Sequence, residues 1–531
     1  MLRKSVTLIS IFILTILSCS ESNTVDDKLI FRYNEHANIS SLDPAFSSTL
    51  RNIGPVNQLF NGLIKLDDSL NISGDLAKKW SISKNGLEYR FLIKKNIKFH
   101  KSEIFGKDST RSVDAYDFEY SFKRLIDPNL ASPGAWSLNK IKSFKALNDS
   151  IFQVNLKAPF SAFLESLSMK YFSVVPKEAV SHFGNKFGKN PIGTGPFKFK
   201  KWEENVKLVL RKNELYFEKD KHGKQLPYLE SISITFLPEK KSEFLEFIKG
   251  KIDYLNSIDS SFKDEILTKN GRLRNKYEKS VNLLTGPYLN TEYIGFFLGK
   301  ENLNSSHKKL RKAINYAIDR KKMMKFLRNN IGSPANHGFI PIGLIGNRTK
   351  GFEYDFNESV RLVNEYKSEN EIENVELTIS TDANYLDIIE FIQRELLKVG
   401  IKIKIDVLPP STMRQAKSNG KLEMFRASWI ADYPDPENYL TLFYSNNKSP
   451  FGPNYTHFEN AKFDSIFLKS YEQQSKTKRF NYYKDLDSMI IEESPIIPLY
   501  YDEVLILTKK NLRGFKINAT NLLKLKEVYK E

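Results

Sequence analysis

The residues that most often carry out enzyme chemistry are present in this chain, but their spacing matches no catalytic motif. No two of the seven histidines stand at H-x-x-H or H-x-x-x-H spacing, so a zinc-hydrolase signature is absent. These histidines are His36, His100, His182, His222, His307, His337 and His457. Gly193-Thr194-Gly195-Pro196 is not a G-x-G-x-x-G turn, and no P-loop or G-x-S-x-G elbow occurs. We therefore expect a protein that is not an enzyme and that has no cofactor and no metal site.

The single cysteine, Cys19, follows a short hydrophobic segment near the N-terminus. Arg3 and Lys4 precede an apolar run that ends at Leu17, which is shorter than the roughly 20 residues of a membrane-spanning helix. The pattern is typical of a signal peptide. Ile16-Leu17-Ser18-Cys19 resembles the lipobox of bacterial lipoproteins, so we expect lipidation of Cys19; the alternative is a plain signal peptide with a chance cysteine.

The charge of the chain is positive but dispersed. Lys and Arg number 81 and Asp and Glu 63, which gives a formal net charge of +18. An excess of this size favours an anionic partner such as a membrane surface, a nucleic acid or an acidic ligand. The basic residues form no run of five or more, and no nucleic-acid-binding module is present. We therefore expect no nucleic-acid partner.

The elements that could position a site include both helices and strands, which predicts an α/β fold. Alternating apolar and polar residues predict strands at 87–93, 207–210 and 232–236. Apolar residues at helical spacing predict one amphipathic helix over 307–324. A strand at 375–380, a helix at 385–399 closed by Gly400 and a strand at 401–407 predict a βαβ unit with a right-handed crossover.

A series of short segments in a fixed order carries the most information. In chain order the segments are Leu42-Asp43-Pro44, Leu59-Phe60-Asn61-Gly62-Leu63, Asp75-Leu76-Ala77-Lys78-Lys79-Trp80, Pro191-Ile192-Gly193-Thr194-Gly195-Pro196, Leu310-Arg311-Lys312-Ala313-Ile314-Asn315 and Arg426-Ala427-Ser428-Trp429-Ile430-Ala431-Asp432. With the lipobox in front, the series resembles the extracytoplasmic solute-binding proteins of the peptide/nickel ABC-transporter family, above all the oligopeptide-binding lipoproteins. The resemblance covers nearly the whole chain after the signal peptide.

The resemblance implies the architecture. The expected fold is the two-lobed type II fold of periplasmic binding proteins, with mixed sheets and three domains, one of them discontinuous. The lobes would close on the ligand by a hinge motion. The expected segments are a signal peptide (1–18), a lipidated tether (19–27), domain I in three parts (28–60, 188–285 and 491–531), domain II (61–187) and domain III (286–490).

The resemblance also implies which residues hold a ligand. A peptide buried between lobes needs a carboxylate for its ammonium group and a strand-like backbone on each side. On the family pattern, Asp432 would bind the ammonium and Arg426 the carboxylate of a short peptide. The backbone of Ser428, Trp429 and Ile430 would pair with the peptide from one side. The segment of about 52–56, with Asn52, Ile53, Gly54 and Pro55, would pair from the other.

The expected partners follow from the same resemblance. They are a peptide ligand, the permease subunits of an ABC importer with their ATPases, and a membrane reached through the lipid anchor. The protein would be a monomer on the extracytoplasmic or periplasmic face of the cell envelope. A dipeptide, a nickel chelate, haem or an oligosaccharide remain alternative ligands, and a surface lipoprotein without a transport role is an alternative function. Peptide length and side-chain preference stay open.

Overall fold

The computed structural model describes residues 29–258, 262–299, 304–345 and 349–531. The predicted signal peptide, the tether and Cys19 lie outside these residues. In the part of the chain that is described, no helix has the length and hydrophobicity required to cross a bilayer.

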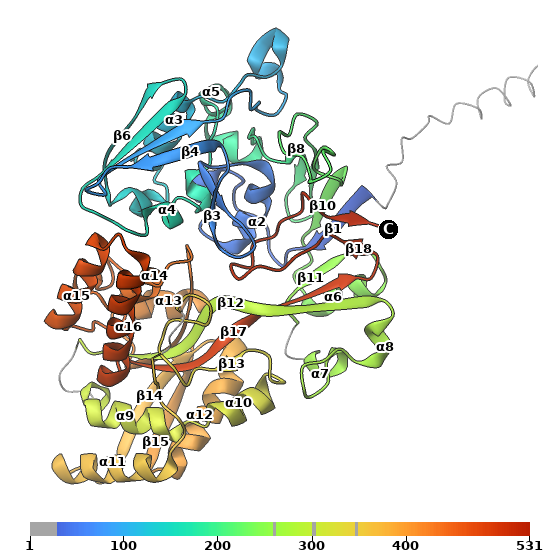
Figure 1. The fold of residues 1–531 in the computed structure, drawn as a ribbon. Helices are drawn as coiled ribbons and strands as arrows, with labels where there is room; N and C mark the ends of the chain where they lie inside the picture. The colour runs from blue at the N-terminus through green and yellow to red at the C-terminus, as the bar shows by residue number, and fades with distance from the viewer. Residues whose placement is uncertain (1–28, 259–261, 300–303, 346–348) are drawn as a thin grey trace, which may run out of the picture.

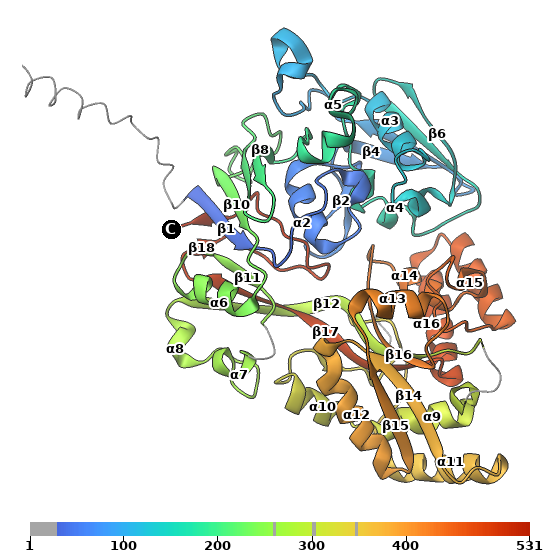
Figure 2. The same ribbon diagram turned by 180° about the vertical axis from the view of Figure 1, so that it is seen from behind.

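The chain forms two lobes, one above the other in Figure 1, and Figure 2 shows the same division from behind. We call them the upper lobe, built by β1 to β11 and the C-terminal segment, and the lower lobe, built by α9 to α16 with β13 to β16. The upper-lobe strands are β1 (Ile30–Asn34), β2 (Ile64–Leu66), β3 (Ile72–Gly74), β4 (Ala77–Ile82), β5 (Glu88–Ile93), β6 (Ile141–Asn148), β7 (Ile151–Leu156), β8 (Phe197–Glu203), β9 (Lys207–Lys212), β10 (Ser231–Thr235) and β11 (Tyr254–Asn256). Its main helices are α2 (Leu50–Leu59), α3 (Ala115–Leu125), α5 (Lys177–Phe183) and α6 (Lys240–Ile248).

The lower lobe carries the longest of the described helices. Its strands are β13 (Ser333–Pro334), β14 (Val375–Thr381), β15 (Ile401–Val407) and β16 (Met424–Ile430). Its main helices are α9 (Lys308–Ala317), α10 (Arg320–Leu327), α11 (Phe356–Glu369), α12 (Leu386–Lys398), α13 (Pro410–Ser418), α15 (Ala461–Glu472) and α16 (Lys476–Glu493). A separate core cluster of buried apolar residues lies among β14, β15, α9, α11 and α12.

Two long antiparallel strands connect the lobes. β12 (Val281–Phe296) and β17 (Ile496–Lys509) pair with each other, and Figure 1 shows both running from one lobe into the other. The pairing is irregular between Pro287 and Thr291. Through this pair the strands of both lobes join into one sheet of 11 strands, in the order β15-β14-β16-β12-β17-β11-β1-β10-β9-β8 with β13 on β17. A separate antiparallel sheet, β4-β5-β7-β6, lies in the upper lobe.

Most of the predicted elements are confirmed. The strands predicted at 87–93, 207–210 and 232–236 are β5, β9 and β10. The βαβ unit is β14-α12-β15, with parallel strands and Gly400 at a φ of 80° after the helix. The mixed α/β class and the two-lobed fold are confirmed as well.

One predicted helix is wrong in its continuity. The segment 307–324 holds two helices, α9 and α10, separated at Ile318 and Asp319. The break has a local cause, because the side chain of Asp319 accepts a hydrogen bond from the backbone N–H of Lys322 at 2.9 Å and so caps α10. The buried Arg320 then donates to the backbone oxygen of Asn315 at 3.0 Å and fixes the turn.

The limits between the domains remain predictions. The expected limit at 285 lies inside β12, one of the two connecting strands. Ile497, Leu499 and Tyr500 of β17 belong to the lower-lobe core cluster, although the expected limit at 490 would place them in domain I.

Candidate functional site

The loop that carries Asp432 follows directly after β16, at the junction of the lobes. β16 pairs with β12 along its whole length, from Met424 to Ile430. Its other neighbour, β14, pairs only at Met424 and Phe425. Residues 426–430 therefore have no second strand partner within the described part of the chain, and this edge offers backbone N–H and C=O groups for pairing.

Asn438, which is buried, holds the loop in position. Its side-chain oxygen accepts a hydrogen bond from Trp429 Nε1 at 2.9 Å and another from the backbone N–H of Asp432 at 3.1 Å. Nearby, the hydroxyl of Tyr439 donates to the backbone oxygen of Leu289 on β12 at 2.6 Å. The orientation of Asp432 is thus set by buried polar contacts.

The carboxylate of Asp432 has no cationic partner among the described residues. The residue is exposed to solvent, but the protein groups near its carboxylate partly desolvate it and raise the pKa of Asp432 to about 6. The hydrogen bond with Asn438 lowers this pKa to a smaller extent. Tyr171, from the upper lobe, lies close enough that burial and the charge of Asp432 together raise the pKa of Tyr171 to about 12. Asp432 therefore faces the other lobe with an uncompensated negative charge.

Arg426 is already paired. Its guanidinium contacts the carboxylate of Glu292 on β12, and its central carbon lies 3.1 Å from the ring centroid of Tyr385. Burial raises the pKa of Glu292, although Arg426 acts in the opposite direction. Arg426 Nε is buried without a hydrogen-bond partner. The sequence placed Arg426 at the site but did not reveal this ion pair.

A second ion pair continues the cluster. Arg328 Nη2 lies 2.7 Å from Asp502 Oδ1, and the side-chain nitrogen of Asn290 donates to Glu292 at 3.2 Å and to Asp502 at 3.3 Å. Asn290, Glu292 and Asp502 are all at the irregular part of the β12–β17 pair. Glu292 could have been noticed in the sequence, because it is the only charged residue in the stretch 283–299.

The predicted extended segment at 52–56 is wrong in conformation. Asn52, Ile53, Gly54 and Pro55 lie inside α2, so their backbone cannot pair with a peptide as a strand. The reason is a helix cap one turn earlier: Thr49 has an extended backbone, and its side chain accepts from the N–H of Asn52 at 3.4 Å. The extended backbone on this side lies at Thr49, before the helix.

The Gly193-Thr194-Gly195-Pro196 turn packs against the end of α2. A Cβ on Gly195 would lie 2.4 Å from the backbone oxygen of Gln58, and one on Gly193 would lie 2.1 Å from that of Leu59. Thr194 Oγ1 also donates to Asn61 Oδ1 at 2.9 Å. Glycine is required here because two backbones approach closely, which agrees with a structural role.

Comparison with known proteins identifies the family. The sequence profile described as "Bacterial extracellular solute-binding proteins, family 5 Middle" matches residues 71–451, most of the chain. The chain belongs to this family.

Individual relatives are distant but match over nearly their full length. The solute-binding protein described here is 25% identical to the oligopeptide-binding protein OppA of Bacillus subtilis, over 99% of this chain and 98% of that protein. It is 23% identical to the dipeptide-binding protein DppE of the same organism, over 96% and 93%. The solved structure of the periplasmic binding protein DppA from Helicobacter pylori, in complex with the peptide STSA, superimposes with a TM-score of 0.78 at 24% identity, over 94% of this chain and 98% of that one.

Proposed function

We propose that this solute-binding protein captures peptides between its two lobes and delivers them to the permease of an ABC importer. The observation that carries the proposal is Asp432, a carboxylate without a cationic partner among the described residues, beside the edge of β16 that β14 does not cover. A peptide supplies what both features need, namely an ammonium group for Asp432 and backbone groups for residues 428–430. The names of the relatives, which are dipeptide- and oligopeptide-binding proteins, support the same ligand class.

The proposal also covers the residue that meets the ligand's carboxylate, the backbone contact on the upper lobe and the membrane anchor. Because Arg426 is ion-paired with Glu292, we propose that it meets a ligand carboxylate only as part of that pair. On the upper lobe we place the backbone contact at Thr49, the extended residue before α2. We further propose that the protein is a monomer without catalytic activity, held at the outer face of a membrane by lipid on Cys19.

Two measurements test the proposal. Mass spectrometry of protein purified under native conditions should release peptides, whereas a nickel chelate, haem or oligosaccharide in their place would contradict it. Calorimetric titration should then show that tetra-alanine binds and that N-acetylated tetra-alanine, which lacks the ammonium group, does not. Equal affinity for the two peptides would refute the role of Asp432.

A further inference from the structure

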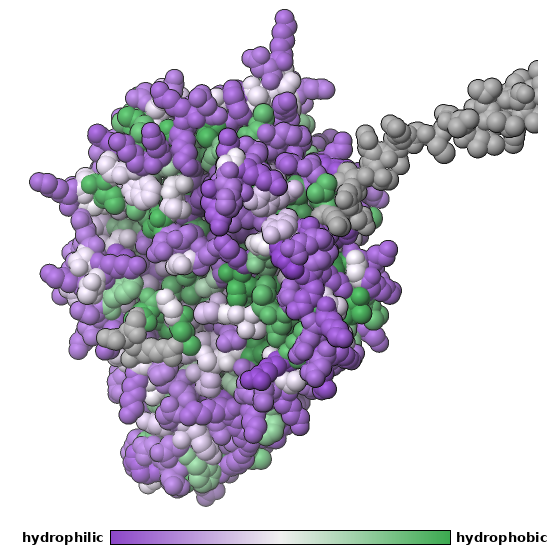
Figure 3. Space-filling model, turned by 45° about the vertical axis from the view of Figure 1, so that its right-hand side comes forward, coloured by the Kyte–Doolittle hydropathy of each residue, from purple (hydrophilic) through white to green (hydrophobic). Residues whose placement is uncertain are grey.

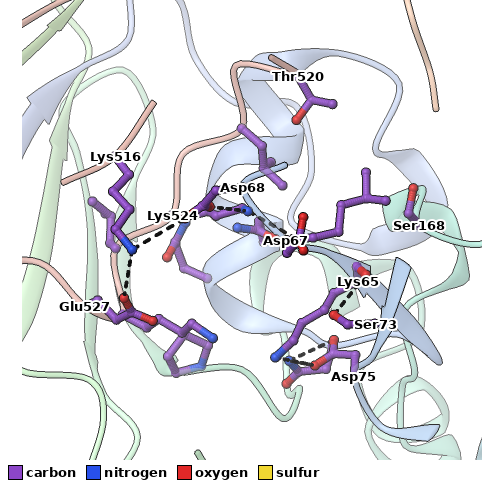
Figure 4. Close-up of a pocket in the computed structure, with 18 of the residues that line it drawn as sticks. Lys65, Asp67, Asp68, Ser73, Asp75, Ser168, Lys516, Thr520, Lys524 and Glu527 are labelled. Carbon is purple, nitrogen blue, oxygen red and sulfur yellow. Dashed lines mark hydrogen bonds and ion pairs between the residues drawn. The ribbon is translucent and has the colours of Figure 1, made fainter. Parts of the chain in front are cut away.

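The upper lobe contains a charged pocket that is separate from Asp432. Its volume is about 280 Å³, and it lies between the β2–β3 hairpin, residues 168–170 and the C-terminal segment 514–527 (Figure 4). All of its lining residues fall between 57 and 75, at 168–170, at 196 and 216, or at 514–527. None comes from the lower lobe, so closure of the lobes is not needed to form the pocket.

Five lysines contribute to the lining, and four of them already have acidic partners. The five are Lys65, Lys170, Lys516, Lys524 and Lys526. Lys65 and Lys526 both contact the carboxylate of Glu218. Lys524 lies 3.0 Å from Asp68, and Lys516 lies 3.6 Å from the same carboxyl group and 3.8 Å from Glu527. Figure 4 shows Lys516, Lys524 and Asp68 converging on one side of the pocket.

Lys170 is the exception. No described residue forms an ion pair with its ammonium group, and burial lowers the pKa of Lys170 to about 8. The acid that influences it most, Asp75, is engaged elsewhere: it accepts hydrogen bonds from Asn61 Nδ2 at 3.0 Å and from the backbone N–H of Gly62 at 3.1 Å. A largely buried ammonium without a counter-charge is costly, so this position favours an anion from outside the chain.

The acids of the pocket are all engaged by groups other than Lys170. Four acidic residues line it, Asp67, Asp68, Asp75 and Glu527, and a fifth, Glu218, is the partner of Lys65 and Lys526. Asp67 is occupied by the backbone N–H groups of Ser69 at 2.8 Å and Asn71 at 2.9 Å. Every acid therefore already has a donor, and Lys170 is the lysine of the pocket without an ion-pair partner among the described residues. The charges of Lys65, Lys524 and Lys526 also act on Lys170, which places several cations around one small volume.

We propose that this pocket binds a small oxyanion, phosphate or the carboxylate of an organic acid, with Lys170 as its main ligand and Lys524 beside it. The site is distinct from the peptide site, because it uses only the upper lobe. Bound anion would supply the counter-charge that Lys170 lacks, so it would stabilise the folded upper lobe whether or not peptide is present.

Phosphate titration of the purified protein tests this proposal. The Tm would be measured by thermal unfolding, and the anion affinity by calorimetry. Each measurement would use inorganic phosphate or acetate, with sodium chloride at the same ionic strength for comparison. Three proteins are compared: the wild type, Lys170→Met, and Lys142→Met as a control at an exposed position on β6. We expect phosphate or acetate, and not chloride, to raise the Tm of the wild type and of the control. Lys170→Met should bind the anion at least about tenfold more weakly, the loss expected for one charge-assisted contact.

The outcomes separate this proposal from the peptide site. Lys170→Met should unfold at a higher temperature than the wild type when no oxyanion is present, because it removes an unpaired buried charge. Asp432→Asn should retain the phosphate response in full. The proposal is overturned if phosphate, acetate and chloride act alike on the wild type, or if Lys170→Met responds to the oxyanions as strongly as Lys142→Met.

Discussion

The affinity for peptide should fall in mild acid, and Asp432 should be the cause. The surrounding protein raises the pKa of Asp432 to about 6, and only the ionised form can pair with an ammonium group. With this pKa, about nine-tenths of Asp432 is ionised at pH 7 and about one-tenth at pH 5. The α-amino group of a peptide, with a pKa near 8, stays protonated throughout this range. Affinity should therefore decrease about tenfold between pH 7 and pH 5.

The Asp432→Asn variant separates this effect from general acid effects. At pH 7 it should bind tetra-alanine roughly 10- to 150-fold more weakly, which corresponds to a charge-assisted hydrogen bond of about 1.5–3 kcal/mol. Its remaining affinity should be nearly constant between pH 5 and pH 7. Glu390→Gln, at an exposed position on the outer side of α12, is the matched control and should behave as the wild type.

Isothermal titration calorimetry in buffers of different ionisation enthalpy is the suitable assay, because it reports protons as well as affinity. Near pH 6 the wild type should release about half a proton for each peptide bound, and Asp432→Asn should release almost none. A wild-type affinity that does not change from pH 7 to pH 5, or an Asn variant that keeps the full pH dependence, would refute this account of the site.

Three further predictions follow from the contacts around the site. Glu292→Gln should lower the free energy of unfolding by about 3 kcal/mol in urea titrations, since it leaves the buried Arg426 with only the more distant carboxylate of Asp382, 4.0 Å away; an unchanged midpoint would contradict the pairing. Asn438→Ala should weaken peptide binding about tenfold in calorimetry, because Trp429 and Asp432 lose their shared acceptor; unaltered affinity would mean that the loop is held by other contacts. Gly195→Ala should lower the Tm, at a cost of about 1–3 kcal/mol, since its Cβ would meet the backbone at Gln58; a stability equal to the wild type would show that the turn can move.

The sequence was most informative where one local pattern decides the structure. The βαβ unit at 375–407 was predicted almost to the residue, because period-2 strands flank a period-3.6 helix that Gly400 ends. The helix at 307–324 was predicted as one element from the apolar face between Leu310 and Ile318, although the next positions at helical spacing, 321 and 322, are both lysine. The cap at Asp319 and the long-range contacts of Arg320 that divide it have no apolar signature.

The sequence pattern indicated the residues of the candidate site but not the pairs that they form. The motif around Asp432 predicted a carboxylate that binds ligand, and the structure places Asp432 after β16 without a cationic partner among the described residues. The family resemblance implied an extended segment at 52–56, and Gly54 and Pro55 both disfavour helix, yet the cap at Thr49 starts a helix that includes them. The partner of Arg426 could not be derived, since Glu292 is 134 residues away in the chain.

The β12–β17 pair has a consequence for how such proteins can be recombined. The chain enters the lower lobe on one strand and leaves it on the neighbouring antiparallel strand, so the two ends of this lobe lie about 5 Å apart. A segment with adjacent ends can be exchanged as a cassette without rerouting the rest of the chain. Asp432, Arg426 and Glu292 would travel with that cassette, while the N-terminal segment and the lysine pocket would stay behind. Grafting the lower lobe onto a relative should therefore transfer the residues proposed to bind the ligand's charged ends. The recipient's own upper lobe should remain unchanged.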